Sequence, residues 1–445
     1  MELVVIGGDA AGMSAASRAK RNRTDFNITV FEKTQDVSYS ACGMPYNIAD
    51  PDRGMDDLIV RRAEVFRQKQ GIEVRTGHHV ERIDRETRTI FGTTEEGSIF
   101  HKTYDTLLMA TGASAVIPEI PGTHHPGVMA LKSLEDGRKI KKYIDETPVR
   151  KCIIFGMGYI ALEMAEALWA RGIAVEMVKP GPDFLPWMNP ELSEVVRKEV
   201  EAHEVKMHVK VSIEKIEPFG GKLHVIGSGN RFTGEMILIA AGVKPNSRLA
   251  ADAGLHLGPQ SSIYVDKKMR TSDESIFAAG DCADAYHVVT GEKVWIPLAL
   301  RANRSGWAAA DNICGTRILL SGVAGTAVFK VFDLEAARTG LNMAEAGKAG
   351  FDPVSVTITS RSRAHAHPGS STIWVNMVGD KKSGRLLGVQ MVGKEGVAHR
   401  INAPAVALHG RMTVEEFSQS DLAYAPPFGP VWDPMLTAAN QLLKK

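Results

Sequence analysis

The sequence predicts an α/β protein with two doubly wound parallel sheets, followed by a smaller α+β domain. Two stretches share one order of elements: an apolar strand, a glycine-rich turn, an alanine-rich helix and a second apolar strand. They run from Leu3 through Gly7–Gly12 to Ile28–Glu32, and from Cys152 through Gly156–Ala161 to Ala174–Val178. Units of this kind bind dinucleotides at the turn between strand and helix. Beyond about Gly322 no such turn recurs, which indicates a third domain of mixed strands and helices.

Apolar strands followed by crossings divide the chain into four segments. Tyr104–Gly112 is typical of a strand that ends in a turn, and Pro118 and Pro121 then mark a crossing. A second strand and crossing follow at Met236–Gly242 and Val243–Asn246, and a third strand at Ile276–Ala279 precedes Gly280. We therefore predict one nucleotide-binding domain from residues 1–113 and 246–322, a second from residues 114–245, and a final domain from residues 323–445.

Composition limits the classes of protein and of partner. The 445 residues carry a formal net charge of +1, so the overall charge gives no reason to expect nucleic-acid binding. No apolar run approaches the roughly 18 residues of a membrane helix, and residues 1–8 are typical of a buried strand and not of a signal peptide. We expect a cytoplasmic protein without membrane association. The four cysteines lie far apart, which predicts neither a disulfide framework nor a metal site, and Cys152 is typical of a buried apolar residue.

The first glycine turn, Gly7–Gly12, is expected to hold the pyrophosphate of a dinucleotide. Small residues let the phosphates approach backbone N–H groups at the start of a helix. Glu32, at the end of the following strand, is placed to bond ribose hydroxyls. Asp9 stands where glycine is usual, and a glycine-rich turn without a ligand is the alternative.

The second glycine turn, Gly156–Ala161, matches the GxGxxA pattern and predicts a second dinucleotide. Lys179 occupies the ribose position after the next strand, while Glu176 belongs to the buried pattern of that strand. A cation there accommodates a 2′-phosphate, whereas an acid favours a free hydroxyl. The residue favours NADPH and leaves NADH open. A merely solvated Lys179 is the alternative.

A cysteine lies in the Gly- and Pro-bounded turn Ser38–Tyr46. Cys42 precedes a predicted helix, whose dipole is expected to lower the pKa of the thiol and favour the thiolate. Neither Val37 nor Asn47, five residues to either side, is a cysteine. A lone thiolate of this kind must cycle through a mixed disulfide, a persulfide or a sulfenic acid.

Taken together, these motifs resemble those of the flavin-dependent pyridine nucleotide–disulfide oxidoreductases, over nearly the whole chain. Within that family the chain is most similar to the coenzyme A-disulfide reductases and the related persulfide reductases. The matching stretches are Gly7–Gly12 with Glu32, Ser38–Tyr46, Ala110–Gly112, Gly156–Glu163, Thr271–Asp281 and Tyr424–Phe428.

The resemblance implies two cofactors, FAD and NADPH or NADH. For FAD it implies contacts with Gly7, Gly8, Asp9, Ala10, Ala11, Gly12, Glu32, Lys33, Ala110, Thr111, Gly112, Gly280, Asp281 and Ala299. For the nicotinamide cofactor it implies contacts with Gly156, Gly158, Tyr159, Ile160, Glu163, Lys179 and Gly242. It also implies that the final domain forms a homodimer interface and brings Tyr424 of one subunit to Cys42 of the other. Cys42, Ser38 and Tyr424 would then be the catalytic residues.

Coenzyme A is the implied small-molecule partner, as a disulfide substrate or as a cap on Cys42. The implied contacts are Ser14, Ser17, Arg18, Arg21, Arg61, Arg62, Asn303 and His367. Arginine suits phosphates because its planar fork bonds two oxygens at once. A solvated helix face is the alternative for the arginines. Ala364–Gly369 departs from the family, which often has an aromatic pair there, so His367 either replaces a hydroxyl donor or is structural.

Two other functions compete with disulfide or persulfide reduction. The first is an NADH oxidase or peroxidase that uses a Cys42 sulfenic acid. Family members of that type carry a histidine where this chain has Ala10, and losing it removes a candidate acid–base group. The second is a non-catalytic flavin redox sensor, against which the complete cysteine turn argues. Persulfide reduction would imply a separate sulfurtransferase partner, since we identify no rhodanese-like extension.

Overall fold

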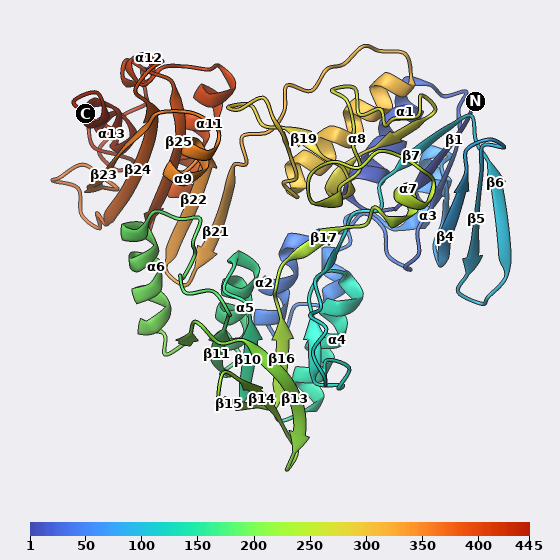
Figure 1. Cartoon of the computed structure of the whole chain (residues 1–445), viewed down its shortest axis with the longest axis horizontal. Helices are drawn as coiled ribbons and strands as arrows, with labels where there is room; N and C mark the ends of the chain where they lie inside the picture. Colours follow the sequence, from blue (N-terminus) through green and yellow to red (C-terminus); the bar gives the residue numbers. More distant parts are fainter.

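Two five-stranded parallel sheets organise most of the computed structural model, which describes residues 1–445 (Figure 1). The first sheet has the strand order β18, β7, β1, β2, β3, with all neighbours parallel. These strands are β1 (Glu2–Ile6), β2 (Asn27–Phe31), β3 (Glu73–Arg75), β7 (Thr106–Met109) and β18 (Ile276–Ala278). Its helices are α1 (Ala10–Asn22), α3 (Ala63–Gln70), α7 (Arg248–Asp252) and α8 (Ala299–Ile313), and β4 (His78–Asp84), β5 (Thr89–Thr94) and β6 (Ile99–Thr103) form an antiparallel sheet beside it.

The second parallel sheet has the order β12, β11, β10, β16, β9. Its strands are β9 (Val128–Ala130), β10 (Lys151–Phe155), β11 (Ala174–Val178), β12 (Lys206–His208) and β16 (Met236–Ile239). The accompanying helices are α4 (Leu134–Glu146), α5 (Tyr159–Ala170) and α6 (Pro190–Ala202), and β13 (Ile213–Phe219), β14 (Lys222–Gly227) and β15 (Asn230–Gly234) form an antiparallel sheet. The predicted α/β class with two doubly wound sheets is confirmed.

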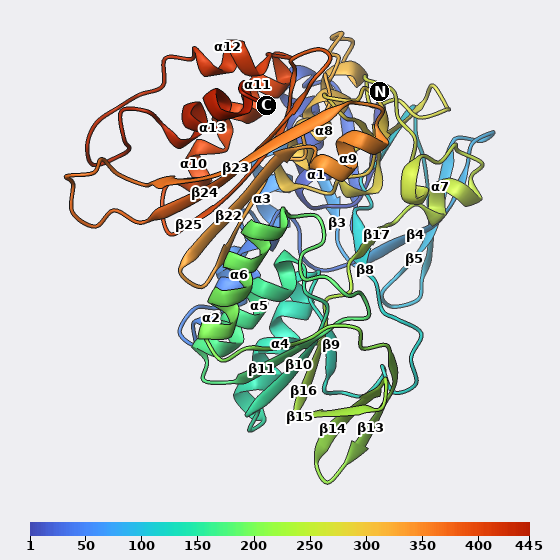
Figure 2. The same cartoon turned by 60° about the vertical axis from the view of Figure 1, so that its left-hand side comes forward.

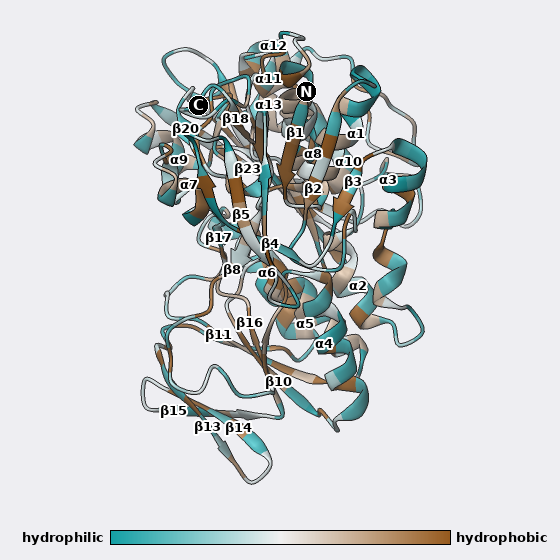
Figure 3. Cartoon of the chain, turned by 90° about the vertical axis from the view of Figure 1, so that its right-hand side faces the viewer, coloured by the Kyte–Doolittle hydropathy of each residue, from teal (hydrophilic) through white to brown (hydrophobic).

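Continuous apolar runs explain why these strands are parallel and central. Leu3–Ile6 and Cys152–Phe155 are almost wholly buried, as strands covered by helices on both faces must be. The hydrophobic colour gathers on strands such as β1, and the hydrophilic colour on outer helices such as α3 (Figure 3). None of the helices combines the length and the apolar character that crossing a membrane requires.

The carboxyl-terminal part is a five-stranded antiparallel sheet with short helices (Figure 2). The order is β21, β22, β25, β24, β23, and these strands are β21 (Ala327–Val331), β22 (Leu334–Gly340), β23 (Pro353–Arg361), β24 (Thr372–Asp380) and β25 (Leu386–Gly393). The helices are α9 (Met343–Lys348), α10 (Val397–Arg400), α11 (Asn402–His409), α12 (Val414–Ser418) and α13 (Pro434–Leu442). This agrees with the predicted α+β character of the final domain.

Two connections between these parts position the cysteine turn. The strands β8 (Ala113–Ala115) and β17 (Val243–Pro245) pair as an antiparallel ribbon between the two parallel sheets. The helix α2 (Met44–Ala49) follows Cys42 in the first part of the chain, yet it packs on α4 and α5 of the second. Its side chains Met44 and Ile48 share a core with Leu162 of α5. The cysteine turn therefore lies where the two doubly wound parts meet.

Candidate active site

The first glycine turn is closed so tightly that only glycine fits at its start. Gly7 has φ +106°, and a Cβ there would lie 2.1 Å from the carbonyl oxygen of Ala110. The neighbouring amide of Gly8 donates to Oε2 of Glu32 at 2.7 Å. The strand ends of β1, β2 and β7 therefore bring the predicted flavin residues Gly7–Gly12, Glu32 and Ala110–Gly112 to one edge of the sheet. Lys33, next to Glu32, is exposed.

Asp9 and Asp281, two carboxylates of the predicted flavin site, lie near one cation that the sequence did not single out. Lys132 forms an ion pair with Asp281, with 3.5 Å between Nζ and Oδ2. Burial raises the pKa of Asp9 to about 6, and the charge of Lys132 opposes that rise. Ser133 and Asp136 form a capping box that marks the helix start beside Lys132, but no local pattern pointed from Lys132 to Asp281. This pair is a feature that only the fold reveals.

The second glycine turn borders a cavity of about 150 Å³. Four of the predicted nicotinamide-cofactor residues line it, namely Gly158, Tyr159, Ile160 and Gly242. The other lining residues are Ala115, Leu131, Ala161, Leu238, Ile239, Ala240 and Val243. Most of this lining is apolar and comes from the start of α5, from β16 and from the ribbon.

The residues around the second ribose position agree with the strand pattern. Lys179 directly follows β11, and its Nζ donates to the carbonyl oxygen of Asp183 at 2.6 Å. Glu176 is buried and pairs with Lys151, with 2.8 Å between Oε1 and Nζ. The carboxylate of Glu176 is therefore already paired within the protein. Lys179 is then the charged residue at the end of the strand.

The cysteine turn is attached at both ends to the two nucleotide-binding parts. Cys42 lies in a single 3-10 turn, Ala41–Gly43, directly before α2. Upstream, the amide of Ser38 donates to the carbonyl oxygen of Gly8 at 3.0 Å. Downstream, the hydroxyl of Tyr46 donates to Oε1 of Glu163 on α5 at 3.2 Å. The turn thus joins the first glycine turn to the helix that follows the second. Tyr46 is a further site residue that the sequence analysis did not assign.

The expectation that the protein lowers the pKa of Cys42 is wrong. Cys42 reaches solvent, but the protein around it raises the pKa of its thiol, through burial first and then through the negative charge of Glu163. Lys132 acts in the opposite direction. The helix α2 has only six residues, and burial and the nearby carboxylates both disfavour the thiolate. Glu163 also has a raised pKa, because of burial, opposed by the hydrogen bond from Tyr46.

Replacing Glu163 with glutamine should therefore make Cys42 more acidic. The substitution removes the nearby negative charge while keeping the side-chain shape, so the pKa of Cys42 should fall. The rate of Cys42 alkylation by iodoacetamide, followed by mass spectrometry across pH, should rise at a lower pH than in the parent. Glu194→Gln, on the exposed face of α6, is the matched control. If the alkylation rate of the Glu163→Gln protein rises at the same pH as in the parent, or at a higher pH, then Glu163 does not raise the pKa of Cys42.

The predicted coenzyme A residues fall into two groups. Ser14 donates to Oδ1 of Asn303 at 2.5 Å, so α1 and α8 bring these two together near Ala299, the first residue of α8. Arg18 donates through Nε and Nη2 to the two carboxylate oxygens of Asp311, at 2.8 and 3.0 Å, and its guanidinium lies 5.2 Å from the ring centroid of Trp307. Ser17 is buried, whereas Arg21, Arg61 and Arg62 are exposed. Arg21 is thus better placed than Arg18 to bind a phosphate.

His367 and Tyr424 lie on neighbouring segments of the final domain. The amide of Ala364 donates to the carbonyl oxygen of Pro426 at 3.0 Å, which joins the two loops. Nδ1 of His367 lies 3.1 Å from the carbonyl oxygen of Pro368, and the side chain of Tyr424 is exposed. The contact of Tyr424 with Cys42 of a second subunit stays a prediction.

All four cysteines are free thiols in the structure, and their surroundings differ. Cys152 and Cys282 are completely buried, and Cys314 is partly buried. The interpretation of Cys152 as a buried apolar residue is confirmed, and burial raises the pKa of its thiol. Cys42 is the exposed cysteine, and it is the one that lies between the two glycine turns.

The chain matches known proteins over its whole length. A family model described as pyridine nucleotide-disulphide oxidoreductase matches residues 1–306, and the dimerisation-domain model of that family matches residues 326–435. The NAD(P)H sulfur oxidoreductase (CoA-dependent) of Pyrococcus furiosus is 39% identical over 444 residues, covering 99% of each chain. A protein named NADH oxidase from Methanocaldococcus jannaschii is 35% identical over 446 residues, covering 100% of this chain and 99% of that one.

The likeness extends to a solved structure. That of a NAD-dependent persulfide reductase from A. fulgidus superposes with a TM-score of 0.96 at 37% identity, covering 100% of this chain and 83% of that one. The two family models together take in both doubly wound parts and the carboxyl-terminal sheet. The chain is therefore an oxidoreductase that belongs to the pyridine nucleotide-disulphide oxidoreductase family.

Proposed function

We propose that this protein uses NAD(P)H and FAD to reduce coenzyme A disulfide, or a related small disulfide or persulfide, through Cys42. The observation that supports this most is the attachment of the cysteine turn to both glycine turns. Ser38 bonds to Gly8 at one end and Tyr46 bonds to Glu163 at the other. An exposed thiol held there lies between the two places where dinucleotides are expected to bind.

The first glycine turn fits a flavin dinucleotide. A Cβ at Gly8 would lie 2.7 Å from the side chain of Val37 and 3.0 Å from that of Glu32, so the turn packs this closely against both only with glycine at this position. Glu32 and Asp281 place carboxylates at this edge of the first sheet. When bound, FAD supplies the transfer of two electrons between the nicotinamide and the sulfur. Gly7–Gly12 would hold its pyrophosphate, and Asp281 its ribityl–phosphate part.

The chemistry at Cys42 is thiol–disulfide exchange. The thiolate attacks one sulfur of the substrate disulfide, which forms a mixed disulfide and releases the other half as a thiol after it takes up a proton. Two electrons from NAD(P)H then cleave the mixed disulfide, releasing the second thiol and restoring the thiolate. Ser38 and, from a partner subunit, Tyr424 would position the sulfur and donate to the leaving group. Each turnover consumes one NAD(P)H and one proton per disulfide.

The proposal also includes the identity of the sulfur acceptor and a preference for NADPH over NADH. The name of the Pyrococcus relative includes coenzyme A, and that of the A. fulgidus structure includes persulfide. With a persulfide acceptor the products would be hydrogen sulfide and a thiol. Lys179 favours NADPH over NADH, and the ratio of kcat/KM for the two cofactors tests that preference.

The deciding experiment compares acceptors with one preparation. NAD(P)H consumption is measured with coenzyme A disulfide, coenzyme A persulfide, hydrogen peroxide and oxygen, and the untreated protein is weighed by mass spectrometry to identify any adduct on Cys42. We expect turnover with the disulfide or the persulfide and slower turnover with peroxide and oxygen. A protein whose flavin is reduced once and never turns over with any acceptor would instead be a redox sensor.

The relative named NADH oxidase favours a second candidate function, the reduction of oxygen or peroxide at Cys42. Ala10 argues against it, because it offers no acid–base group at the start of α1. A higher kcat/KM for oxygen or peroxide than for either sulfur acceptor would favour this second function.

Arg21 and Arg18 should differ in their effect on substrate binding. Arg21→Ala should raise KM for coenzyme A disulfide by about fivefold, the scale of one exposed charge contact, and leave KM for pantetheine disulfide unchanged. Pantetheine disulfide lacks the nucleotide phosphates, so it isolates their contribution. Arg18→Ala should have a smaller effect on KM, since Asp311 already occupies the Arg18 fork.

Arg23→Ala is the matched control for Arg21→Ala, because Arg23 is exposed and pairs with Asp25 at 2.8 Å. It should leave both KM values unchanged. Equal changes of KM for the two disulfides in the Arg21 variant would contradict a phosphate contact at Arg21.

A further inference from the structure

A buried arginine holds the turn that carries Asp281. Arg301 lies in the first turn of α8, and its side chain is 6% exposed. Its guanidinium donates from Nη1 to the carbonyl oxygen of Gly280 at 3.1 Å. From Nη2 it donates to those of Ala283 and Asp284, at 2.8 and 2.6 Å. Three carbonyl groups of one short turn are thus fixed by a single side chain.

The remaining carbonyl groups of this turn are also bound. Trp295 donates through Nε1 to the carbonyl oxygen of Asp281 at 2.7 Å, and the amide of Ile263 donates to that of Cys282 at 2.8 Å. All five carbonyl groups from Gly280 to Asp284 therefore accept a hydrogen bond from outside the turn. Such a turn has little freedom to move the carboxylate of Asp281.

The charge of Arg301 has no carboxylate partner. Asp284, which is completely buried, pairs instead with Lys293, with 2.7 Å between Oδ1 and Nζ. Arg301 has no ion pair within 4.0 Å. Burial lowers the pKa of its guanidinium, and the charges of Asp281 and Asp284 oppose that shift from a longer distance. The group stays charged because its intrinsic pKa is so high. Keeping an unpaired charge in the interior costs free energy, which indicates that the charge has a use.

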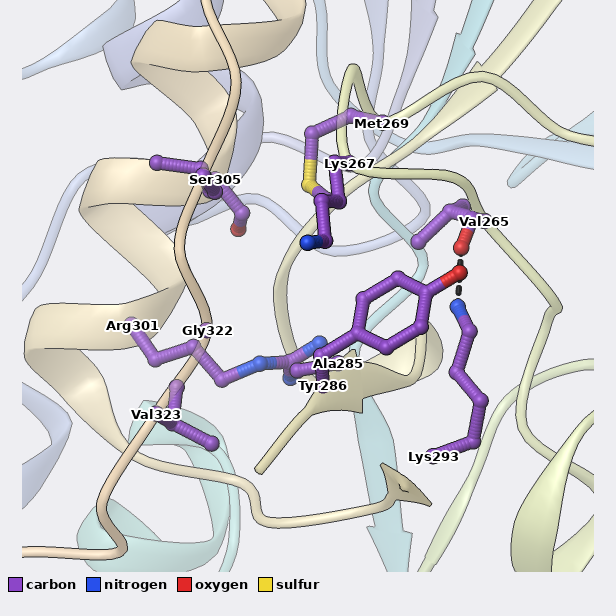
Figure 4. A pocket seen from close by; sticks show the side chains of 11 residues that line it. Val265, Lys267, Met269, Ala285, Tyr286, Lys293, Arg301, Ser305, Gly322 and Val323 are labelled. Carbon is purple, nitrogen blue, oxygen red and sulfur yellow. Dashed lines mark hydrogen bonds between the residues drawn. The ribbon is translucent and has the colours of Figure 1, made fainter. Parts of the chain in front are cut away.

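Two lysines lie near Arg301, and the charge of one of them, Lys293, is balanced by Asp284. Arg301, Lys267 and Lys293 line a cavity of about 20 Å³, room for about one water molecule, around Tyr286 (Figure 4). The Nζ atoms of Lys293 and Lys267 lie 4.2 and 5.3 Å from the ring centroid of Tyr286. The carboxylate of Asp281, within the same turn, is paired with Lys132. Of these three cations, Arg301 and Lys267 form no ion pair with a carboxylate.

We propose that Arg301 is a positioning residue of the flavin site, which fixes the Gly280–Asp284 turn and places a buried positive charge without an ion pair beside it. This inference rests on the proposed function, in which FAD binds against Asp281. A rigid turn favours FAD binding because less freedom is lost on association. A fixed positive charge favours the more negative, reduced form of the cofactor and therefore raises its reduction potential.

Two substitutions separate the geometry from the charge. Arg301→Met removes both, so FAD should dissociate about tenfold more readily, and the midpoint potential should become more negative. Arg301→Lys keeps the charge but has no planar fork, so the potential should stay near that of the parent while FAD binding is weakened to an intermediate degree. Arg304→Met, on the exposed face of the same helix, is the matched control and should change neither quantity.

The measurements are the Kd of the FAD-free protein for FAD, from the quenching of flavin fluorescence, and the midpoint potential from titration against a redox dye. Trp295→Phe removes one hydrogen bond and no charge, so it should weaken FAD binding at unchanged potential, and it provides the test if Arg301→Met does not fold. Arg301→Lys then tests the charge.

Two results would overturn the inference. One is an Arg301→Met protein whose Kd for FAD lies within twofold of the parent value and whose midpoint potential equals that of the parent within error. The other is an equal loss of FAD in the methionine and lysine variants at an unchanged potential, which would make Arg301 merely structural. A parent protein that neither contains nor takes up FAD would refute the proposed function itself, whereas a flavin-containing parent with unaffected variants would refute only this inference.

Discussion

Cys42→Ser should lower NAD(P)H-dependent reduction of coenzyme A disulfide and coenzyme A persulfide by at least about a thousandfold, the scale on which losing a covalent nucleophile acts. A serine hydroxyl cannot form the mixed disulfide, so the step that joins substrate to protein is lost. FAD content should not change, because Cys42 is exposed and makes no side-chain hydrogen bond that holds the turn. The flavin should still be reduced by NAD(P)H and reoxidised by an artificial acceptor such as ferricyanide.

The matched control is Cys314→Ser. Cys314 is free and partly buried at the end of α8, and its only polar contact is a weak one to the carbonyl oxygen of Ala19, at 3.8 Å. The Cys314→Ser protein should retain the parent kcat/KM for both sulfur acceptors. A folded, yellow Cys42→Ser protein that processes either acceptor within tenfold of the parent would rule out the proposed mechanism, since the electrons would then reach sulfur by another path.

Local pattern was enough to predict the two nucleotide-binding folds. A parallel strand buried on both faces must be apolar throughout, and a turn that brings a backbone close to a neighbouring strand must begin with glycine. Both constraints act within a few residues, so they can be read in Leu3–Gly7 and again in Cys152–Gly156. The crossings marked by Pro118 and Pro121 and by Val243–Asn246 were predicted for a similar reason, since proline limits the local backbone.

Contacts between distant segments could not be predicted in this way. The pairing of Lys132 with Asp281 and the capture of Arg18 by Asp311 depend on where whole elements pack. The direction of the Cys42 pKa shift was mispredicted for the same reason. The helix after Cys42 was visible in the sequence, but the burial of the thiol and the nearby charge of Glu163 on α5 depend on how distant elements pack. Arg301 is another example, because an arginine in an alanine-rich helix gives no sign that its partners are carbonyl groups of an earlier turn.

Gly158→Ala should weaken NAD(P)H binding without affecting the stability of the protein. Gly158 has φ −81°, which any residue adopts, and a Cβ there would have no protein atom within 4 Å. The residue lines the 150 Å³ cavity, so the added methyl group would meet the dinucleotide and not the protein. We expect a cost of about 2 kcal/mol, or roughly a thirtyfold higher Kd for NADPH, typical of one methyl group forced into a close contact. Equilibrium binding to the FAD-loaded protein measures it.

Two further glycines make the expected result specific to the second dinucleotide. Gly347→Ala, on α9, also adds a methyl group where no atom lies within 4 Å, and it should leave the Kd for NADPH and the FAD content unchanged. Gly156→Ala should instead lower Tm, because Gly156 has φ +114° and its Cβ would lie 2.2 Å from the carbonyl oxygen of Ala240. If Gly158→Ala keeps both its Tm and its Kd for NADPH, the nicotinamide cofactor does not approach this turn, and electrons must enter the protein elsewhere. A selective loss of NADPH binding would instead mean that the open space beside Gly158 exists for the cofactor, because nothing in the protein itself requires glycine there.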